Sequence, residues 1–139
     1  IARCFTFIGK HILNQKNFAI SNFVNDALYK KNIYVNAKKE TYRSYMYSDD
    51  LVEWLMKILL VSNKNCPTYN VGSDESVSIK DVASTIGKIF KKSIKYDQIK
   101  SNKIDYYVPN IKKPNKDLNL KIKYSFKKAI LASIKDIKK

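Results

Sequence analysis

Short segments rich in β-branched and aromatic residues alternate along this chain with segments whose apolar residues recur every three or four positions. Segments of the first kind are typical of strands, and segments of the second kind are typical of amphipathic helices. Because the two kinds alternate from one end to the other, the pattern excludes an all-helical bundle and an all-β sandwich. It predicts an α/β fold, with an α+β-like arrangement of short strands and helices.

The predicted elements follow from this alternation. Strands are predicted at 1–8, 33–35, 42–47, 69–71 and 94–96, the first of them mostly buried. Helices are predicted at 18–30, 51–61, 79–90, 115–120 and from Phe126 to Ile137, and loops at 10–17, 36–41 and 97–106. Ser48, Ser78 and Ser125 precede helical patterns and are predicted helix caps. Ser78 would form a capping box with Asp81.

Several single residues have predicted environments. Trp54 lies on the apolar face of its helix and should be in the core, whereas His11 should be exposed in a loop. Cys4 should be buried in its strand, and its distance from Cys66 gives no metal-ligand spacing. Reduced thiols, no signal-peptide pattern and no apolar run of ~20 residues predict a cytoplasmic location. Because residue 1 is not Met and 1–8 already has a strand pattern, we expect further sequence upstream.

The charge is the second strong feature of the chain. The formal net charge is +15, and arginine occurs only as Arg3 and Arg43. Residues 88–139 hold sixteen lysines against four acidic residues. A Lys-rich solvated surface explains this excess, and a small basic module that binds nucleic acid or another polyanion is the alternative. The scarcity of arginine argues against a nucleic-acid reader, because the planar fork of arginine reads phosphates and bases.

Four segments, in order, are similar to motifs of the extended short-chain dehydrogenases that act on nucleotide sugars. Residues 3–9 resemble R-x-F-N-x-x-G-P, and residues 42–51 resemble R-x-(Y/F)-x-Y-x-x-D-(L/V). Residues 69–73 followed by 76–79 resemble YNVGS…SI, and residues 108–126 resemble the closing P-D-I-x-K-x-x-x-x-L-G-(W/L) and final helix. The chain departs from these motifs at Thr6 (family Asn), Lys10 (Pro) and Tyr106 (a second phosphate-binding Arg).

The resemblance implies a fold and an organisation. It identifies residues 1–139 as the C-terminal, substrate-binding part of an NAD-dependent epimerase or dehydratase, similar to dTDP-glucose 4,6-dehydratase, with the Rossmann NAD-binding part missing. Residues 1–9 would be the last strand region shared with that part. The branch it resembles is common among lipopolysaccharide-sugar genes, and its members are lyases or isomerases. Left alone, the first strand would expose an apolar edge and make the chain marginally soluble.

The family's catalytic groups have no counterpart in these residues. Its NAD site needs a Gly-rich turn, whereas Gly9, Gly72 and Gly87 are scattered. Tyr34 and Lys38 have the family's Tyr-x-x-x-Lys spacing, but at a strand end rather than on a helix. We therefore predict no catalytic residue and no metal site, and we expect the isolated chain to be inactive.

The resemblance also implies a substrate site. Arg43 matches an Arg on the sugar-nucleotide diphosphate, and its alternative role is an ion pair with a nearby carboxylate such as Asp50. Asn70 matches an amide near the phosphates, with capping of turn backbone as its alternative. Tyr34 and Asn36 match the strand that passes the pyrimidine base, and Ser21 and Asn22 match residues at the start of a helix. Thr6 matches a position near the sugar. The implied partners are a UDP- or dTDP-linked sugar, a separate NAD-binding half and a second copy in a homodimer, with no membrane and no nucleic acid.

Overall fold

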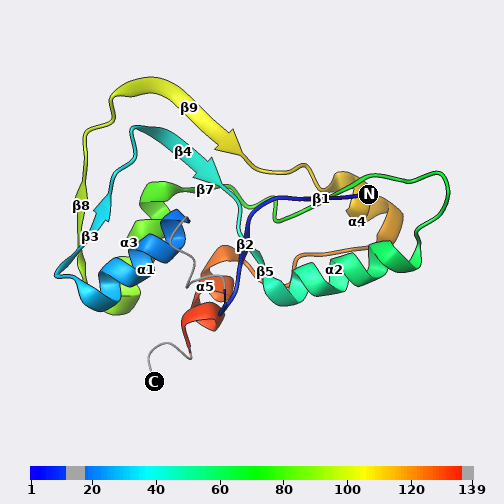
Figure 1. Cartoon of the computed structure of the whole chain (residues 1–139), viewed down its shortest axis with the longest axis horizontal. Coiled ribbons are helices and arrows are strands. Elements are labelled where there is room, and N and C mark those ends of the chain that lie inside the picture. Colours follow the sequence, from blue (N-terminus) through cyan, green and yellow to red (C-terminus); the bar gives the residue numbers. More distant parts are fainter. Residues whose placement is uncertain (12–17, 136–139) are drawn as a thin grey trace.

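The computed structural model of the chain describes residues 1–11 and 18–135, and it has a mixed α/β fold (Figure 1). In chain order, the elements are β1 (Ala2–Cys4), β2 (Phe7–Ile8), α1 (Ala19–Tyr29), β3 (Asn32–Val35), β4 (Lys39–Arg43), β5 (Met46–Tyr47), α2 (Ser48–Leu60), β6 (Tyr69–Val71), β7 (Val77–Ser78), α3 (Ile79–Phe90), β8 (Ser93–Tyr96), β9 (Ser101–Tyr107), α4 (Lys112–Leu118) and α5 (Phe126–Ile134). The predicted fold class is confirmed.

The described strands form several small sheets rather than one large one. The pairs β1–β6, β2–β5 and β3–β8 are each parallel. The largest sheet has the order β7-β4-β9, with β4 antiparallel to β7 and parallel to β9. Figure 1 shows β3, β8, β4 and β9 bordering one end of the molecule beside α1 and α3, while α2, β1 and α4 occupy the other end.

Two hydrophobic cores hold these ends together. The larger core lies among α1, α3 and α5 and includes the fully buried Val24, Val82 and Ile130. The smaller core surrounds Trp54 of α2 and contains Met46, Ile58, Tyr69, Val71, Ile111 and Leu120. The prediction that Trp54 belongs to the core is confirmed, since its side chain is 0% exposed. Tyr47 of β5 packs against the larger core and its neighbour Met46 belongs to the smaller one, so β5 links them.

Most predicted elements are confirmed, and the structure shows why their ends lie where they do. α1, α2, α3, β3, β6 and β8 lie within one or a few residues of their predicted ranges. Ser78 caps α3 as predicted, because its Oγ accepts the Asp81 N–H at 3.0 Å. Ser125 occupies the cap position of α5 without a side-chain cap bond. Ser48 is not a cap: α2 begins at Ser48, and Tyr47 is the cap residue.

Three predictions about the strands are wrong. Residues 36–41 and 97–106 are not all loop, because Lys39–Arg43 and Ser101–Tyr107 pair with each other as β4 and β9. The predicted strand 42–47 is therefore two strands, β4 and β5, separated by residues 44–45. Strand pairing between segments about 60 residues apart in sequence leaves little local pattern.

The first strand differs most from its prediction. β1 and β2 replace the single strand 1–8, and Ala2, Arg3 and Cys4 are all exposed. Cys4 is therefore not buried, because β1 pairs with β6 along one edge and no described element covers its faces. His11 is exposed as predicted. The predicted helix at 115–120 is α4, which begins and ends earlier.

Two further predictions fall partly outside the described residues: most of the loop 10–17, and Ile137 at the end of the last helix. Within residues 1–11 and 18–135, no helix is both long enough and apolar enough to cross a membrane.

Candidate functional site

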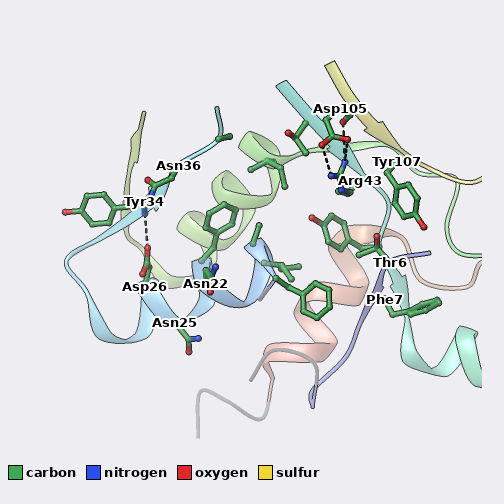
Figure 2. A pocket seen from close by; sticks show the side chains of 18 of the residues that line it. Thr6, Phe7, Asn22, Asn25, Asp26, Tyr34, Asn36, Arg43, Asp105 and Tyr107 are labelled. Carbon is green, nitrogen blue, oxygen red and sulfur yellow. Dashed lines mark hydrogen bonds and ion pairs between the residues drawn. The ribbon is translucent and has the colours of Figure 1, made fainter. Parts of the chain in front are cut away.

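An open cleft of about 1450 Å³ lies where α1, β3, β4 and β9 meet the segment that joins β1 to β2 (Figure 2). Its two ends differ in chemistry. At one end lie Arg43, Asp105 and Tyr107, with Thr6 nearby, and at the other lie Tyr34 and Asn36. A cleft of this size can hold an elongated ligand of two or more groups.

Arg43 is the last residue of β4 and lies at the first end of the cleft, which we call the cationic end. Its Nη1 donates to the Tyr42 carbonyl at 2.8 Å and to Asp105 Oδ1 at 3.2 Å, and its Nη2 donates to Asp105 Oδ2 at 3.1 Å. The two nitrogens thus hold the carboxylate of β9 with both of its oxygens, which is the geometry that guanidinium groups also use for phosphate. No bond from Arg43 Nε is found within the described residues.

Lys39 reaches the same carboxylate from the start of β4, with its Nζ 3.0 Å from Asp105 Oδ2. Hydrogen bonds from Arg43 first and from Lys39 second lower the pKa of the Asp105 carboxyl from 3.8 to about 2. Because the folded state favours the charged form, the stabilising contribution of this group is fully present above pH 3.8. It is lost as the pH falls through about 2. The carboxylate is therefore ionised near neutral pH.

Aromatic rings form the wall beside Arg43. The rings of Phe5 and Tyr107 stack with centroids 4.7 Å apart, and the Arg43 guanidinium lies 5.9 Å from the Tyr107 centroid. Gly72 makes this arrangement possible, because a Cβ there would lie 3.1 Å from Phe5 Cβ and 2.8 Å from Pro109 Cγ. On β9, Asp105 and Tyr107 face the cleft, while Tyr106 is 60% exposed and its ring lies near that of Tyr42.

The opposite end is polar and partly aromatic. Asp26 of α1 is buried, and its Oδ2 accepts the Tyr34 N–H at 3.1 Å while its Oδ1 forms an ion pair with Lys30 at 2.8 Å. Lys30 Nζ lies 5.7 Å from the Tyr34 ring. The hydrogen bond to Asp26, more than any other contact, raises the pKa of Lys30. Asp26 of α1 thereby holds β3 in place and sets the position of Tyr34.

The floor of the cleft is apolar. Tyr45 is buried, its ring packs on that of Phe126, and burial raises the pKa of its hydroxyl to about 12. A phenol with so high a pKa stays neutral and is a poor proton acceptor near neutral pH. In the described ranges there is no group of three or more His, Cys, Asp or Glu that could hold a metal ion.

Five of the seven residues that the sequence singled out line this cleft: Thr6, Asn22, Tyr34, Asn36 and Arg43. The other two do not line it. Ser21 is a fully buried residue of α1, and Asn70 of β6 donates from Nδ2 to the Asn110 carbonyl at 3.0 Å.

Arg43 does form an ion pair with a carboxylate, as its alternative role predicted, but the partner is not Asp50. Asp50 is buried at the start of α2, where its Oδ2 accepts the N–H groups of Lys123 and Tyr124, each at 3.1 Å. Arg43 pairs with Asp105 instead. This role of Asp105 was not predicted, because residues 97–106 were expected to form a loop. Tyr107 was not predicted as a site residue either.

The residues present do not form a cradle for the pyrophosphate of NAD. Gly9 lies against Ser48, Gly72 lies against Phe5 and Pro109, and Gly87 lies inside α3 against Ile94. None of these glycines has a positive φ. A dinucleotide turn needs several glycines together at the start of a helix, so no step through NAD can be assigned to the described residues.

Comparisons with known proteins give two kinds of likeness. No protein-family model matches the chain. Its sequence is 26% identical over 141 residues to UDP-glucuronic acid decarboxylase 1 of Arabidopsis thaliana, covering 99% of this chain and 32% of that protein. The chain thus spans about a third of the length of the curated relatives it matches.

Solved structures agree on the fold. UDP-glucuronic acid 4-epimerase from Bacillus cereus, in complex with UDP-glucuronic acid and NAD, matches 99% of this chain with a TM-score of 0.79, 22% identity and 44% of its own chain covered. dTDP-glucose 4,6-dehydratase from Bacillus anthracis, in complex with NAD, matches 99% with a TM-score of 0.82, 18% identity and 43% covered. The resemblance inferred from the motifs is confirmed at the level of fold. These likenesses do not favour the basic nucleic-acid module.

Proposed function

We propose that this chain is the nucleotide-sugar-binding part of an NAD-dependent sugar epimerase, dehydratase or decarboxylase, and that its cleft holds the nucleoside diphosphate. The observation that carries the proposal is the presence of Arg43 in one cleft with Thr6, Asn22, Tyr34 and Asn36. These residues come from four separate segments of the chain, so their meeting in the cleft does not follow from adjacency in sequence. The fold that positions them is shared with enzymes solved with UDP-sugars and NAD.

Each residue has a role that its chemistry supports. The guanidinium of Arg43 can bind two phosphate oxygens at once, which neutral side chains of the cleft cannot do. Tyr34 and Asn36 lie at the other end, where a ring and an amide suit a planar pyrimidine base. Thr6 lies nearer to Arg43 and offers a hydroxyl to the sugar. We assign no contact to Ser21 or Asn70.

In the whole enzyme, NAD would oxidise a sugar carbon by hydride transfer, and the resulting ketone would allow epimerisation, elimination or decarboxylation. The described residues bind and orient the substrate and do not carry out this step. By the same resemblance, the enzyme is a cytoplasmic lyase or isomerase of lipopolysaccharide-sugar biosynthesis, and it works as a homodimer.

The NAD-binding part would join this chain at β1, with residues 1–9 as the shared strand region. Parallel strands are normally buried on both faces, yet β1 is exposed, with Ile1 65% exposed. On α2, Val52, Met56, Leu59 and Leu60 are also exposed. We expect the isolated chain to self-associate in sedimentation experiments, and a monomeric chain that stays soluble at high concentration would contradict this arrangement.

Calorimetric titration with UDP tests the binding role. We expect saturable binding of UDP, and Arg43→Ala should weaken it at least about tenfold, because the variant loses charge-assisted hydrogen bonds to phosphate. Arg3→Ala is the matched control, since Arg3 is the other arginine of the chain and lies on β1, outside the cleft.

Titration of the same chain with short DNA tests the alternative, a basic module that binds polyanions. If UDP is not bound, or if Arg43→Ala and Arg3→Ala weaken it equally, the cleft is not the nucleotide site. Strongly salt-dependent DNA binding without a UDP response would identify the chain as a polyanion module.

A further inference from the structure

The cationic end of the cleft carries its own anion. The Asp105 carboxylate accepts one hydrogen bond from Arg43 Nη1 and one from Arg43 Nη2, and the Asp105 backbone carbonyl accepts a further one from Nη1 at 3.3 Å. Lys39 binds the same carboxylate. The Arg43 fork that could hold a phosphate is therefore already filled by a group of the same charge and a similar shape.

The position of Asp105 follows from the β4–β9 pairing. Asp105 lies opposite Thr41, and Tyr107 lies opposite Arg43, so the carboxylate on β9 falls within reach of the guanidinium on β4. Asp105 and Arg43 both line the cleft, and their side chains are 29% and 27% exposed. An anion in the cleft can therefore reach the pair without a change in the fold.

From this geometry we infer that Asp105 is a resident competitor for the anion site of the cleft and that it limits affinity for the diphosphate group of a ligand. A diphosphate that binds Arg43 must either displace the carboxylate from the fork or approach the remaining N–H groups beside a negative charge. Both routes weaken binding. The inference rests on the proposed function, since it describes the same site.

The charges at this end support the inference. Arg43 and Lys39 contribute two positive charges and Asp105 removes one, so the local sum is one positive charge facing a ligand group with two or more negative charges. The low pKa of Asp105, about 2, means that the carboxylate stays charged at neutral pH, so protonation does not release the fork. Displacement by a ligand is then the way to free Arg43.

Asp105→Asn tests this directly, because asparagine keeps the size and one acceptor oxygen but removes the charge. We expect UDP and inorganic pyrophosphate to bind roughly three- to tenfold more tightly to the variant, from the removal of one like charge near the phosphates. Asp74→Asn makes the same change in net charge at an exposed residue outside the cleft and should leave the affinity within about twofold.

Combining the change with Arg43→Ala separates competition from general electrostatics. In the Arg43→Ala background, Asp105→Asn should raise the log affinity for UDP by less than about half as much as it does in the wild-type background. The reason is that the guanidinium that Asp105→Asn would release is absent. Urea unfolding of each variant shows whether β9 stays in place.

The outcomes divide clearly. Unchanged or weaker binding by a folded Asp105→Asn variant, while the wild type binds UDP through Arg43, overturns the competitor role and leaves the proposed function standing. An equal gain in Asp74→Asn also overturns it. If neither wild type nor any variant binds UDP, both the inference and the proposed function fail.

Discussion

Replacing Trp54 with alanine is expected to lower the free energy of unfolding by about 3–5 kcal/mol, the range for removing a large buried aromatic side chain. The Trp54 side chain is 0% exposed and packs at the centre of the smaller core, among residues of β5, β6 and α4. Its Nε1 also donates to the Lys121 carbonyl at 3.4 Å. Because β5 and β6 on one side of Trp54 are held by strand pairing, we expect a cavity to remain in the variant.

Urea unfolding measures this change. It is followed by far-UV circular dichroism rather than by tryptophan fluorescence, because the chain has one tryptophan and the variant lacks it. Trp54→Phe should cost less than half as much, because most of the packing remains. Val52→Ala is the matched control on the same helix, where Val52 is 60% exposed, and it should change stability by no more than about 0.5 kcal/mol. A cost for Trp54→Ala below about 1 kcal/mol would show that α2 does not pack as described.

Asp50→Ala is expected to lower the free energy of unfolding by about 2–4 kcal/mol. The buried carboxylate accepts the N–H groups of Lys123 and Tyr124, and its loss leaves both part-buried donors without that acceptor. It also removes a negative charge from the positive end of the α2 dipole. Because the two donors lie just before α5, the change should also loosen the attachment of α5.

Asp50→Asn serves as the comparison, since its amide oxygen can still accept one or both hydrogen bonds, and we expect it to cost about 1 kcal/mol. The pH dependence gives a second check. Burial raises the pKa of Asp50 above 3.8, so this group stabilises the fold most at pH below 3.8, and part of that contribution is lost as the pH rises through the folded pKa. The cost of Asp50→Ala should therefore be larger at pH 3 than at pH 7, and a larger cost at pH 7 would contradict the assignment.

The local elements of this fold could be predicted from the sequence because each has a local cause. α3 begins at Ser78, whose hydroxyl caps it, and its apolar residues recur at helical spacing. α2 has two acidic residues in its first turn, followed by an apolar run. Such features depend on residues that are close together in the sequence, so the sequence predicts them.

The parts that could not be predicted depend on contacts between distant segments. β9 pairs with β4 across about 60 residues, and neither its sequence nor its polarity distinguishes it from a loop. Asp105, which pairs with the Arg43 guanidinium, was therefore missed. An ion pair of Arg43 with a nearby carboxylate was expected as its alternative role, but with Asp50 as the example. Cys4 was predicted to be buried because strand composition says nothing about whether another element covers the strand.

The candidate site was predicted in part. The resemblance to nucleotide-sugar enzymes identified Arg43, Tyr34, Asn36, Asn22 and Thr6, and the structure brings all five to one cleft. Composition and spacing alone would not have grouped them, since they lie on separate segments. The Asp26 carboxylate accepts the Tyr34 N–H and so holds β3 against α1, and no sequence motif indicates this contact.

The most direct test of the account is to map UDP binding by NMR on the ¹⁵N-labelled chain. We predict saturable shifts in the backbone amides of Asn22, Tyr34, Asn36 and Arg43, with those of β1 and α4 unchanged. Shifts that instead follow the lysines of α4 and α5, or no shifts at all at high UDP concentration, would contradict the claim that this cleft binds the nucleoside diphosphate.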